Sequence, residues 1–186
     1  MTVLRHLPNL ICLLRLALVW PVAAAAAAGN FLLALTLFLV AAVSDGLDGF
    51  LAKRFRWTSE LGKFLDPMAD KLLLMTLFIE FAWLELIPWW VTAAAVARDV
   101  LIGLGALVFR VWFGPLRGRP TRISKINTGA QLLYLMGVMC YAAVDFPPHE
   151  ILDALAVITF VTIVLSGYQY VAIFTRRIWS APAQPS

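Results

Sequence analysis

"SDGLDGFLAKRFRWTSELGKFLDPMADK", residues 44–71, is a polar segment with four aspartates inside an otherwise apolar chain. Of the 186 residues, 62% are hydrophobic and 14% are charged, whereas soluble domains are roughly half apolar and a quarter charged. The mean hydropathy is +0.85. This composition predicts an integral membrane protein in which residues 44–71 contain a connection between two membrane helices.

The apolar segments on both sides of this stretch set the number of predicted spans. A bilayer core about 30 Å thick is crossed by about 20 mostly apolar helical residues. We therefore expect an all-α membrane protein with one domain over residues 1–178 and a disordered C-terminal tail at 179–186. Six transmembrane helices are predicted, at about 10–28, 31–52, 65–84, 88–112, 126–144 and 151–175.

The distribution of Lys and Arg predicts the orientation, because cytoplasmic connections collect basic residues. Basic residues precede the first span, lie between spans two and three and between four and five, and follow the sixth. The connections at 29–30, 85–88 and 145–150 contain none. Both termini are therefore predicted to be cytoplasmic. Because the basic residues are spread along one rim of the protein, nucleic-acid binding is not expected.

The four aspartates fall into two pairs at helical spacing. Asp45 and Asp48 are three residues apart at the end of the second span, and Asp66 and Asp70 are four apart at the start of the third. Residues at these spacings share one helix face. Since a short connection makes the two spans antiparallel neighbours, we expect four carboxylates to converge at the cytoplasmic edge of the bilayer.

Converging carboxylates repel one another in a medium of low dielectric constant and require neutralisation. Oxygen ligands of this kind favour hard cations such as Mg²⁺ or Mn²⁺. Gly49, Ala52 and Gly62 accompany the acids at helical spacing and leave room for a ligand. A metal beside carboxylates and basic residues suits a diphosphate, here one attached to a lipid. In the structural alternative, the aspartates cap helices or pair with neighbouring basic residues, namely Lys53, Arg54, Lys63 and Lys71.

The same residues resemble the signature of a known family. The pattern D-x2-D-G-x2-A-R-x8-G-x3-D-x3-D is typical of CDP-alcohol phosphatidyltransferases, and this chain carries Asp45-x2-Asp48-Gly49-x2-Ala52-Lys53-x8-Gly62-x3-Asp66-x3-Asp70. Lys53 stands where the family usually has Arg, so the charge is kept but the planar fork is lost, and Arg54 could substitute for it. The family's fold is six transmembrane helices in a homodimer, in agreement with the predicted number of spans.

The resemblance implies transfer of a phosphatidyl group from CDP-diacylglycerol to an alcohol, with release of CMP. Asp45, Asp48, Asp66 and Asp70 would be ligands of two Mg²⁺ or Mn²⁺ ions, and Asp70 would also act as general base on the acceptor hydroxyl. CDP-diacylglycerol would bind at Gly49, Ala52, Lys53, Arg54 and Gly62. The resemblance also implies a bacterial or mitochondrial inner-membrane enzyme with its active site at the cytoplasmic or matrix face.

The acceptor site is expected at basic residues further along the chain. Arg98 and Asp99 lie inside the fourth span, where charge is costly and usually functional. Arg119, Arg122 and Lys125 approach the same cytoplasmic rim, and together with Arg98 they are candidates to bind an acceptor phosphate. The structural alternatives are a self-contained Arg98–Asp99 ion pair that supports packing and an ordinary positive cytoplasmic connection.

Two branches of the family resemble the whole chain: cardiolipin synthases, whose acceptor is phosphatidylglycerol, and phosphatidylglycerophosphate synthases, whose acceptor is glycerol 3-phosphate. The segment 120–131 is more similar to the first branch, so phosphatidylglycerol is the favoured acceptor and glycerol 3-phosphate the alternative. A divalent-cation transporter is a remote alternative. It predicts acids near the bilayer midplane, whereas the aspartates of this chain are expected at one rim.

Overall fold

A computed structural model describes residues 7–55, 60–113 and 121–180, with side chains described for 14, 16–44, 71–108 and 121–175. Within these ranges the secondary structure consists of helices and contains no strand. The helices are α1 (Leu7–Ala27), α2 (Phe31–Phe55), α3 (Glu60–Trp83), α4 (Trp89–Phe113), α5 (Arg122–Val144) and α6 (His149–Ser180). The predicted all-α fold is therefore confirmed, and residues 181–186, most of the expected tail, lie outside the described ranges.

Each predicted span corresponds to one helix, but several helices begin earlier than the hydropathy indicated. The third helix begins at Glu60 and the fifth at Arg122. At the start of α5 the side chain of Thr121 accepts a hydrogen bond of 3.2 Å from the backbone N–H of Ser124 and caps the helix. Polar first turns are helical because capping sets where a helix starts, whereas hydropathy marks only the apolar part of it.

Among the described residues, two stretches are long and apolar enough to cross a membrane, Trp89–Val108 in α4 and His149–Thr175 in α6. Shorter apolar helical stretches occur at Leu16–Ala27 and Phe31–Ser44. These lengths and compositions are consistent with a membrane protein. The number of spans, their orientation and the dimer remain predictions.

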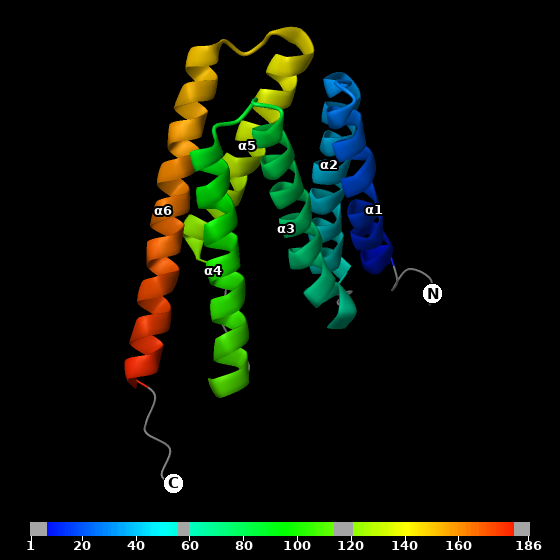
Figure 1. The fold of residues 1–186 in the computed structure, drawn as a ribbon. Coiled ribbons are helices and arrows are strands. Elements are labelled where there is room, and N and C mark those ends of the chain that lie inside the picture. The colour runs from blue at the N-terminus through cyan, green and yellow to red at the C-terminus, as the bar shows by residue number, and fades with distance from the viewer. Residues whose placement is uncertain (1–6, 56–59, 114–120, 181–186) are drawn as a thin grey trace.

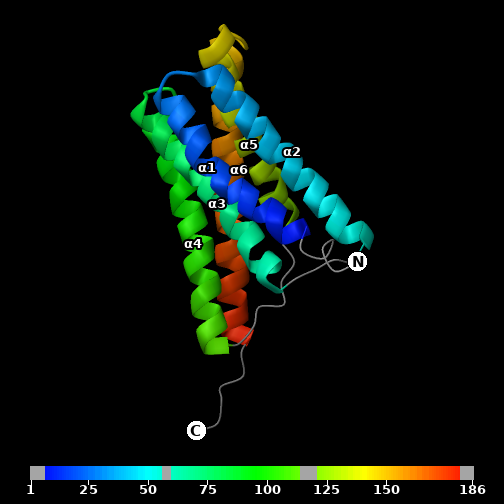
Figure 2. The same ribbon diagram turned by 90° about the vertical axis from the view of Figure 1, so that its right-hand side faces the viewer.

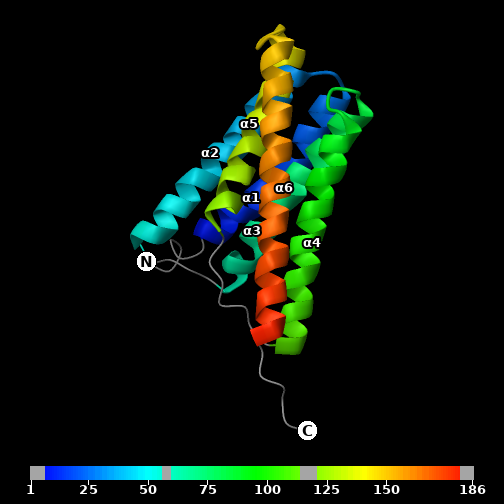
Figure 3. The same ribbon diagram turned by 90° about the vertical axis from the view of Figure 1, so that its left-hand side faces the viewer.

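The helices form two groups, α1 to α3 and α4 to α6 (Figure 1). Helix α1 packs against α2 and α3, while α6 packs against α4 and α5. Contacts of α5 with α2 and of α3 with α4 and α5 join the groups. Figures 2 and 3 show that α4 and α6 run side by side over most of their length, whereas α2 diverges from them towards its C-terminal end. The fully buried core lies mainly between α1, α2, α3 and α5, and its large side chains include Val22, Phe38, Leu77, Phe78, Phe81, Leu135 and Met139.

Three tight connections lie at the same end of the bundle, between α1 and α2, α3 and α4, and α5 and α6 (Figure 1). Gly29 in the first has a φ of +74°, which glycine adopts without steric cost. Asp145 caps α5 in the left-handed conformation, and its N–H donates to Tyr141 O at 2.8 Å. We refer to this end as the turn end. The C-terminal ends of α2, α4 and α6 and the start of α3 lie towards the opposite end (Figure 1).

Candidate active site

The four aspartates of the sequence motif all lie within helices, two in α2 and two in α3. Asp45 and Asp48 belong to the C-terminal half of α2, and Asp66 and Asp70 to the N-terminal half of α3. Because both segments are helical, the spacings of three and four residues place each pair along one helix face. The two helices run antiparallel and α1 packs against both (Figure 1), but no contact between α2 and α3 is found among the described residues, so the expected direct neighbour relation is not confirmed. The motif thus falls away from the turn end.

The remaining motif residues are also helical. Gly49, Ala52, Lys53 and Arg54 are in α2, and Gly62 is in α3. The side chains of residues 45–70 lie outside the described set, so convergence of the carboxylates remains a prediction. Arg119 lies outside the described ranges altogether.

The most developed polar cluster among the described residues surrounds Arg98 of α4. This side chain is buried, with 4% of its surface exposed. Its Nη1 donates to Asp99 Oδ1 at 2.5 Å, and its Nη2 donates to Ser124 Oγ of α5 at 2.8 Å. Nε and Nη2 both donate to Ser166 Oγ of α6, at 3.2 and 2.6 Å. The guanidinium carbon also lies 6.0 Å from the centre of the Tyr170 ring, within cation–π range.

Lys71 connects this cluster to the aspartate motif. Its Nζ donates to Asp99 Oδ1 at 2.6 Å, and it directly follows Asp70 in α3. Asp99 thus binds cations from two helices through one oxygen. The Arg98–Asp99 ion pair expected as a packing element does form, but it is not self-contained, because side chains of α3, α5 and α6 join it. We call Lys71, Arg98, Asp99, Ser124 and Ser166 the Arg98 cluster.

The Arg98 cluster contains donor groups that its internal hydrogen bonds leave unused. Ser124 and Ser166 accept hydrogen bonds from Arg98, and neither hydroxyl donates to any side chain or backbone group in the described part of the chain. A hydroxyl has one proton to donate in addition to its lone pairs. One Nη1 proton of Arg98 is likewise not used in these bonds. The cluster therefore contains neutral and charged donors on three helices that these hydrogen bonds do not use.

The other predicted acceptor residues are more peripheral. Arg122 and Lys125 lie in the first turn of α5 and are both exposed. They flank Ser124 in sequence, which is the residue that bonds to Arg98. The structure thus brings Arg98 into a buried cluster and leaves Arg122 and Lys125 on the surface near its α5 side.

Two buried amide side chains, Asn127 and Gln131, follow Ser124 along α5. Asn127 and Gln131 are 0% and 1% exposed, and Thr162 of α6 donates to Asn127 Oδ1 at 3.1 Å. The Nδ2 of Asn127 and both polar side-chain atoms of Gln131 have no partner among the described residues. Sequence reasoning did not select these two amides or Ser166 as site residues. The helical spacing of Ser124, Asn127 and Gln131 is the signal that could have identified the stripe on α5.

Comparisons with known proteins agree with the motif. The family model for CDP-alcohol phosphatidyltransferases matches residues 5–168, and the chain belongs to this family. It is 32% identical over 182 residues to a probable cardiolipin synthase (CMP-forming) of Drosophila melanogaster, covering 89% of this chain and 56% of the relative. It is 31% identical to the human cardiolipin synthase (CMP-forming), covering 88% and 60%.

A second group of relatives has a different acceptor in its name. The chain is 32% identical over 146 residues to the CDP-diacylglycerol–glycerol-3-phosphate 3-phosphatidyltransferase of Bacillus subtilis, covering 72% of this chain and 69% of the relative. The chain spans less than two thirds of the length of the two cardiolipin synthases. The family predicted from residues 45–70 is confirmed, and both expected branches are represented among the relatives.

Proposed function

We propose that this chain transfers the phosphatidyl group of CDP-diacylglycerol to a glycerol-type acceptor and releases CMP, with phosphatidylglycerol as acceptor and cardiolipin as product. The observation that carries the proposal is the bond between Lys71 and Asp99, because it ties the residue after Asp70 to a buried arginine. This bond supports placing a proposed anion-binding cluster near the motif aspartates. Family membership supports the reaction class.

The aspartate motif fits a divalent metal by its chemistry. Asp45, Asp48, Asp66 and Asp70 provide oxygen donors alone, the set preferred by Mg²⁺ or Mn²⁺, and four carboxylates are enough for two ions. Bound metal would neutralise the charge of the diphosphate and of the departing CMP. Gly49, Ala52 and Gly62 would leave space for the nucleotide beside α2 and α3, with Lys53 or Arg54 on its phosphates.

Asp70 is the proposed general base. The acceptor hydroxyl gives its proton to the Asp70 carboxylate while its oxygen forms a bond to the phosphorus that carries diacylglycerol. The bond between that phosphorus and the bridging oxygen breaks, and CMP leaves with the bonding electrons. Lys71 would hold this part of α3 in position through Asp99.

The Arg98 cluster is the proposed site for the acceptor phosphate. Arg98 and the hydroxyls of Ser124 and Ser166 supply the donors described above, and charge-assisted bonds to phosphate are stronger than neutral ones. Arg119, Arg122 and Lys125 would attract the anion to the rim. We propose phosphatidylglycerol and not glycerol 3-phosphate as the acceptor, because the cardiolipin synthases match a larger share of this chain than the B. subtilis relative does.

The proposed setting is an inner membrane of bacteria or mitochondria, with six spans, both termini on the cytoplasmic or matrix side, and a homodimer. The length and composition of α4 and α6 support membrane insertion. The basic residues near the C-terminal ends of α2 and α4 support placing the aspartate motif on the cytoplasmic side.

Release of CMP by the purified chain tests the function. The protein is incubated with CDP-diacylglycerol and Mg²⁺ or Mn²⁺, with phosphatidylglycerol and glycerol 3-phosphate in separate reactions and Asp70→Asn as the control. We expect Asp70-dependent release with phosphatidylglycerol. Release with glycerol 3-phosphate alone would assign the chain to the other branch. Absence of CMP release, combined with metal-ion flux in vesicles, would favour the transporter.

A further inference from the structure

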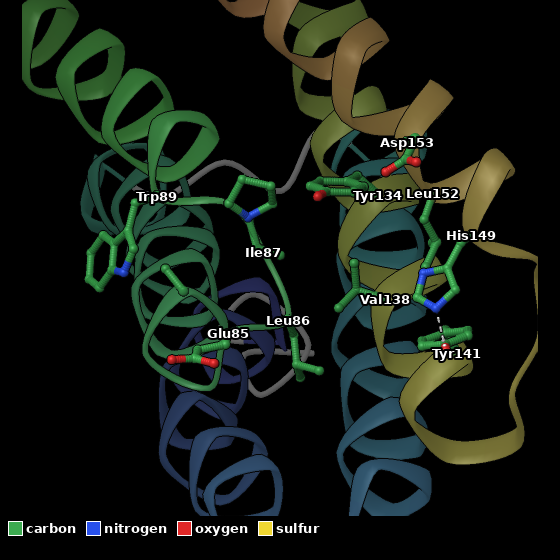
Figure 4. Close-up of a pocket in the computed structure, with 12 residues that line it drawn as sticks. Glu85, Leu86, Ile87, Trp89, Tyr134, Val138, Tyr141, His149, Leu152 and Asp153 are labelled. Atoms are coloured by element: carbon green, nitrogen blue, oxygen red, sulfur yellow. Dashed lines mark hydrogen bonds between the residues drawn. The ribbon is translucent and has the colours of Figure 1, made fainter.

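A second polar pocket lies at the turn end, away from the aspartate motif (Figure 4). It has a volume of about 530 Å³ and is enclosed by the α3–α4 connection, α5 and the first turns of α6. This volume is within the range of small-molecule sites. The reaction proposed above uses none of its residues.

A tyrosine hydroxyl with no hydrogen bond to the described residues faces this pocket. Tyr134 is 2% exposed, and its Oη makes no hydrogen bond to another residue of the described ranges. Figure 4 shows its ring extending from α5 towards the α3–α4 connection, with the hydroxyl in the gap. Polar groups in protein interiors are almost always hydrogen-bonded. A phenol whose ring is buried and whose oxygen reaches a cavity therefore offers a hydrogen bond to a molecule in that cavity.

The pocket is lined with acceptors and acids. Asp153 of α6 lines the pocket together with Tyr134 and is exposed, and no hydrogen bond joins the two. Glu85 lies in the α3–α4 connection and has a left-handed backbone with a φ of 58°. This conformation is uncommon for residues other than Gly, Asn or Asp. Tyr141 and His149 form a hydrogen bond of 2.5 Å on the far wall. No Lys or Arg is among the residues that line the pocket.

We propose that this pocket binds a protonated primary amine. An ammonium group has three donors and no acceptor, which matches the Asp153 carboxylate and the Tyr134 phenol oxygen. Seated between Asp153 and Tyr134, it would donate to the Tyr134 oxygen and form an ion pair with the exposed Asp153 carboxylate. Phenol rings additionally favour a cation. A metal ion is a poorer match, because the described residues contain no group of three or more metal-ligating side chains.

The ammonium group could belong to a phospholipid headgroup or to a soluble amine, and a binding experiment separates these sources. The purified full chain is titrated with dioleoyl phosphatidylethanolamine, with dioleoyl phosphatidylcholine and with ethanolamine, and bound lipid is measured by native mass spectrometry and ethanolamine by equilibrium dialysis. Phosphatidylcholine is the matched lipid control, since its quaternary ammonium has no N–H donor.

Three variants test the residues. Asp153→Asn removes a charge-assisted bond and is expected to weaken amine binding about tenfold, and Tyr134→Phe removes a neutral bond and is expected to weaken it about fivefold. Glu150→Gln is the matched control. It changes the same charge in the first turn of α6, outside the pocket lining, and is expected to stay within about twofold.

The outcomes are distinct from those of the CMP assay. Saturable binding of phosphatidylethanolamine that depends on Asp153 and Tyr134 identifies a lipid headgroup, and the same dependence with ethanolamine alone identifies a soluble amine. Equal binding of both lipids, or equal losses in Asp153→Asn and Glu150→Gln, overturns the proposal. If Asp153→Asn does not fold, the amine affinity of Tyr134→Phe tests the proposal, and an unchanged affinity overturns it.

Discussion

Lys71 of α3 and Asp99 of α4 are joined by an ion pair of 2.6 Å, and the same Asp99 oxygen binds Arg98 at 2.5 Å. One carboxylate therefore holds two cations, one of them buried. Since Lys71 follows Asp70 directly, this contact fixes the α3 backbone beside the proposed base relative to α4.

Replacing Asp99 with Asn is expected to destabilise the protein. The substitution leaves Arg98 buried without its anion, and removing one partner of a buried pair costs about 3 kcal/mol or more. Loss of the Lys71–Asp99 ion pair adds less to this cost, because 35% of the Lys71 side chain is exposed. Thermal unfolding in detergent measures the change. Asp145→Asn is the control, since Asn also tolerates the left-handed conformation at this exposed cap. Equal melting temperatures for the two variants would contradict this role of Asp99.

Ser166→Ala is expected to raise the KM for the acceptor about tenfold, while the KM for CDP-diacylglycerol stays within about twofold. Ser166 accepts two bonds from Arg98 and so positions the guanidinium. Ser124→Ala, which removes one bond, should have a smaller effect in the same direction. Steady-state kinetics with each substrate varied in turn provide the test. A parallel rise in both KM values would instead indicate a general structural defect.

Removal of divalent metal is expected to abolish CMP release, and Mg²⁺ or Mn²⁺ should restore it. Metal stabilisation of transferred phosphoryl groups is worth several kcal/mol, so we expect a loss of more than about 100-fold. Asp45→Asn and Asp66→Asn should show the same loss at saturating metal. Activity that survives both chelation and these substitutions would exclude the proposed metal site.

Two neighbouring glycines of α4 should respond oppositely to alanine. A Cβ at Gly105 would collide with the Phe174 ring of α6, whereas a Cβ at Gly103 would meet nothing within 4 Å. Gly105→Ala is expected to lower the free energy of unfolding by about 1–3 kcal/mol through overpacking. Gly103→Ala should raise it by about 0.5–1 kcal/mol through helix propensity. Thermal unfolding of both variants tests the α4–α6 interface, and a stabilising Gly105→Ala would contradict this packing.

The candidate site residues could be selected from the sequence because charge is rare in it. Arg98 stands out in an apolar segment, and the four aspartates of residues 45–70 have a specific spacing. Ser166 could not be predicted in the same way, because a lone serine in an apolar helix carries no signal. Its role depends on α6 packing against α4, which brings it to Arg98, 68 positions away in sequence.

The sequence by itself determined the six helical segments, the aspartate motif and the family, because apolar length and residue spacing are local properties of the chain. The tertiary structure decided which polar groups meet. It joined Lys71 to Asp99, surrounded Arg98 with hydroxyls from α5 and α6, and left Tyr134 facing the pocket at the turn end. Such contacts depend on how helices cross, and helix crossings are set by the packing of side chains from distant segments.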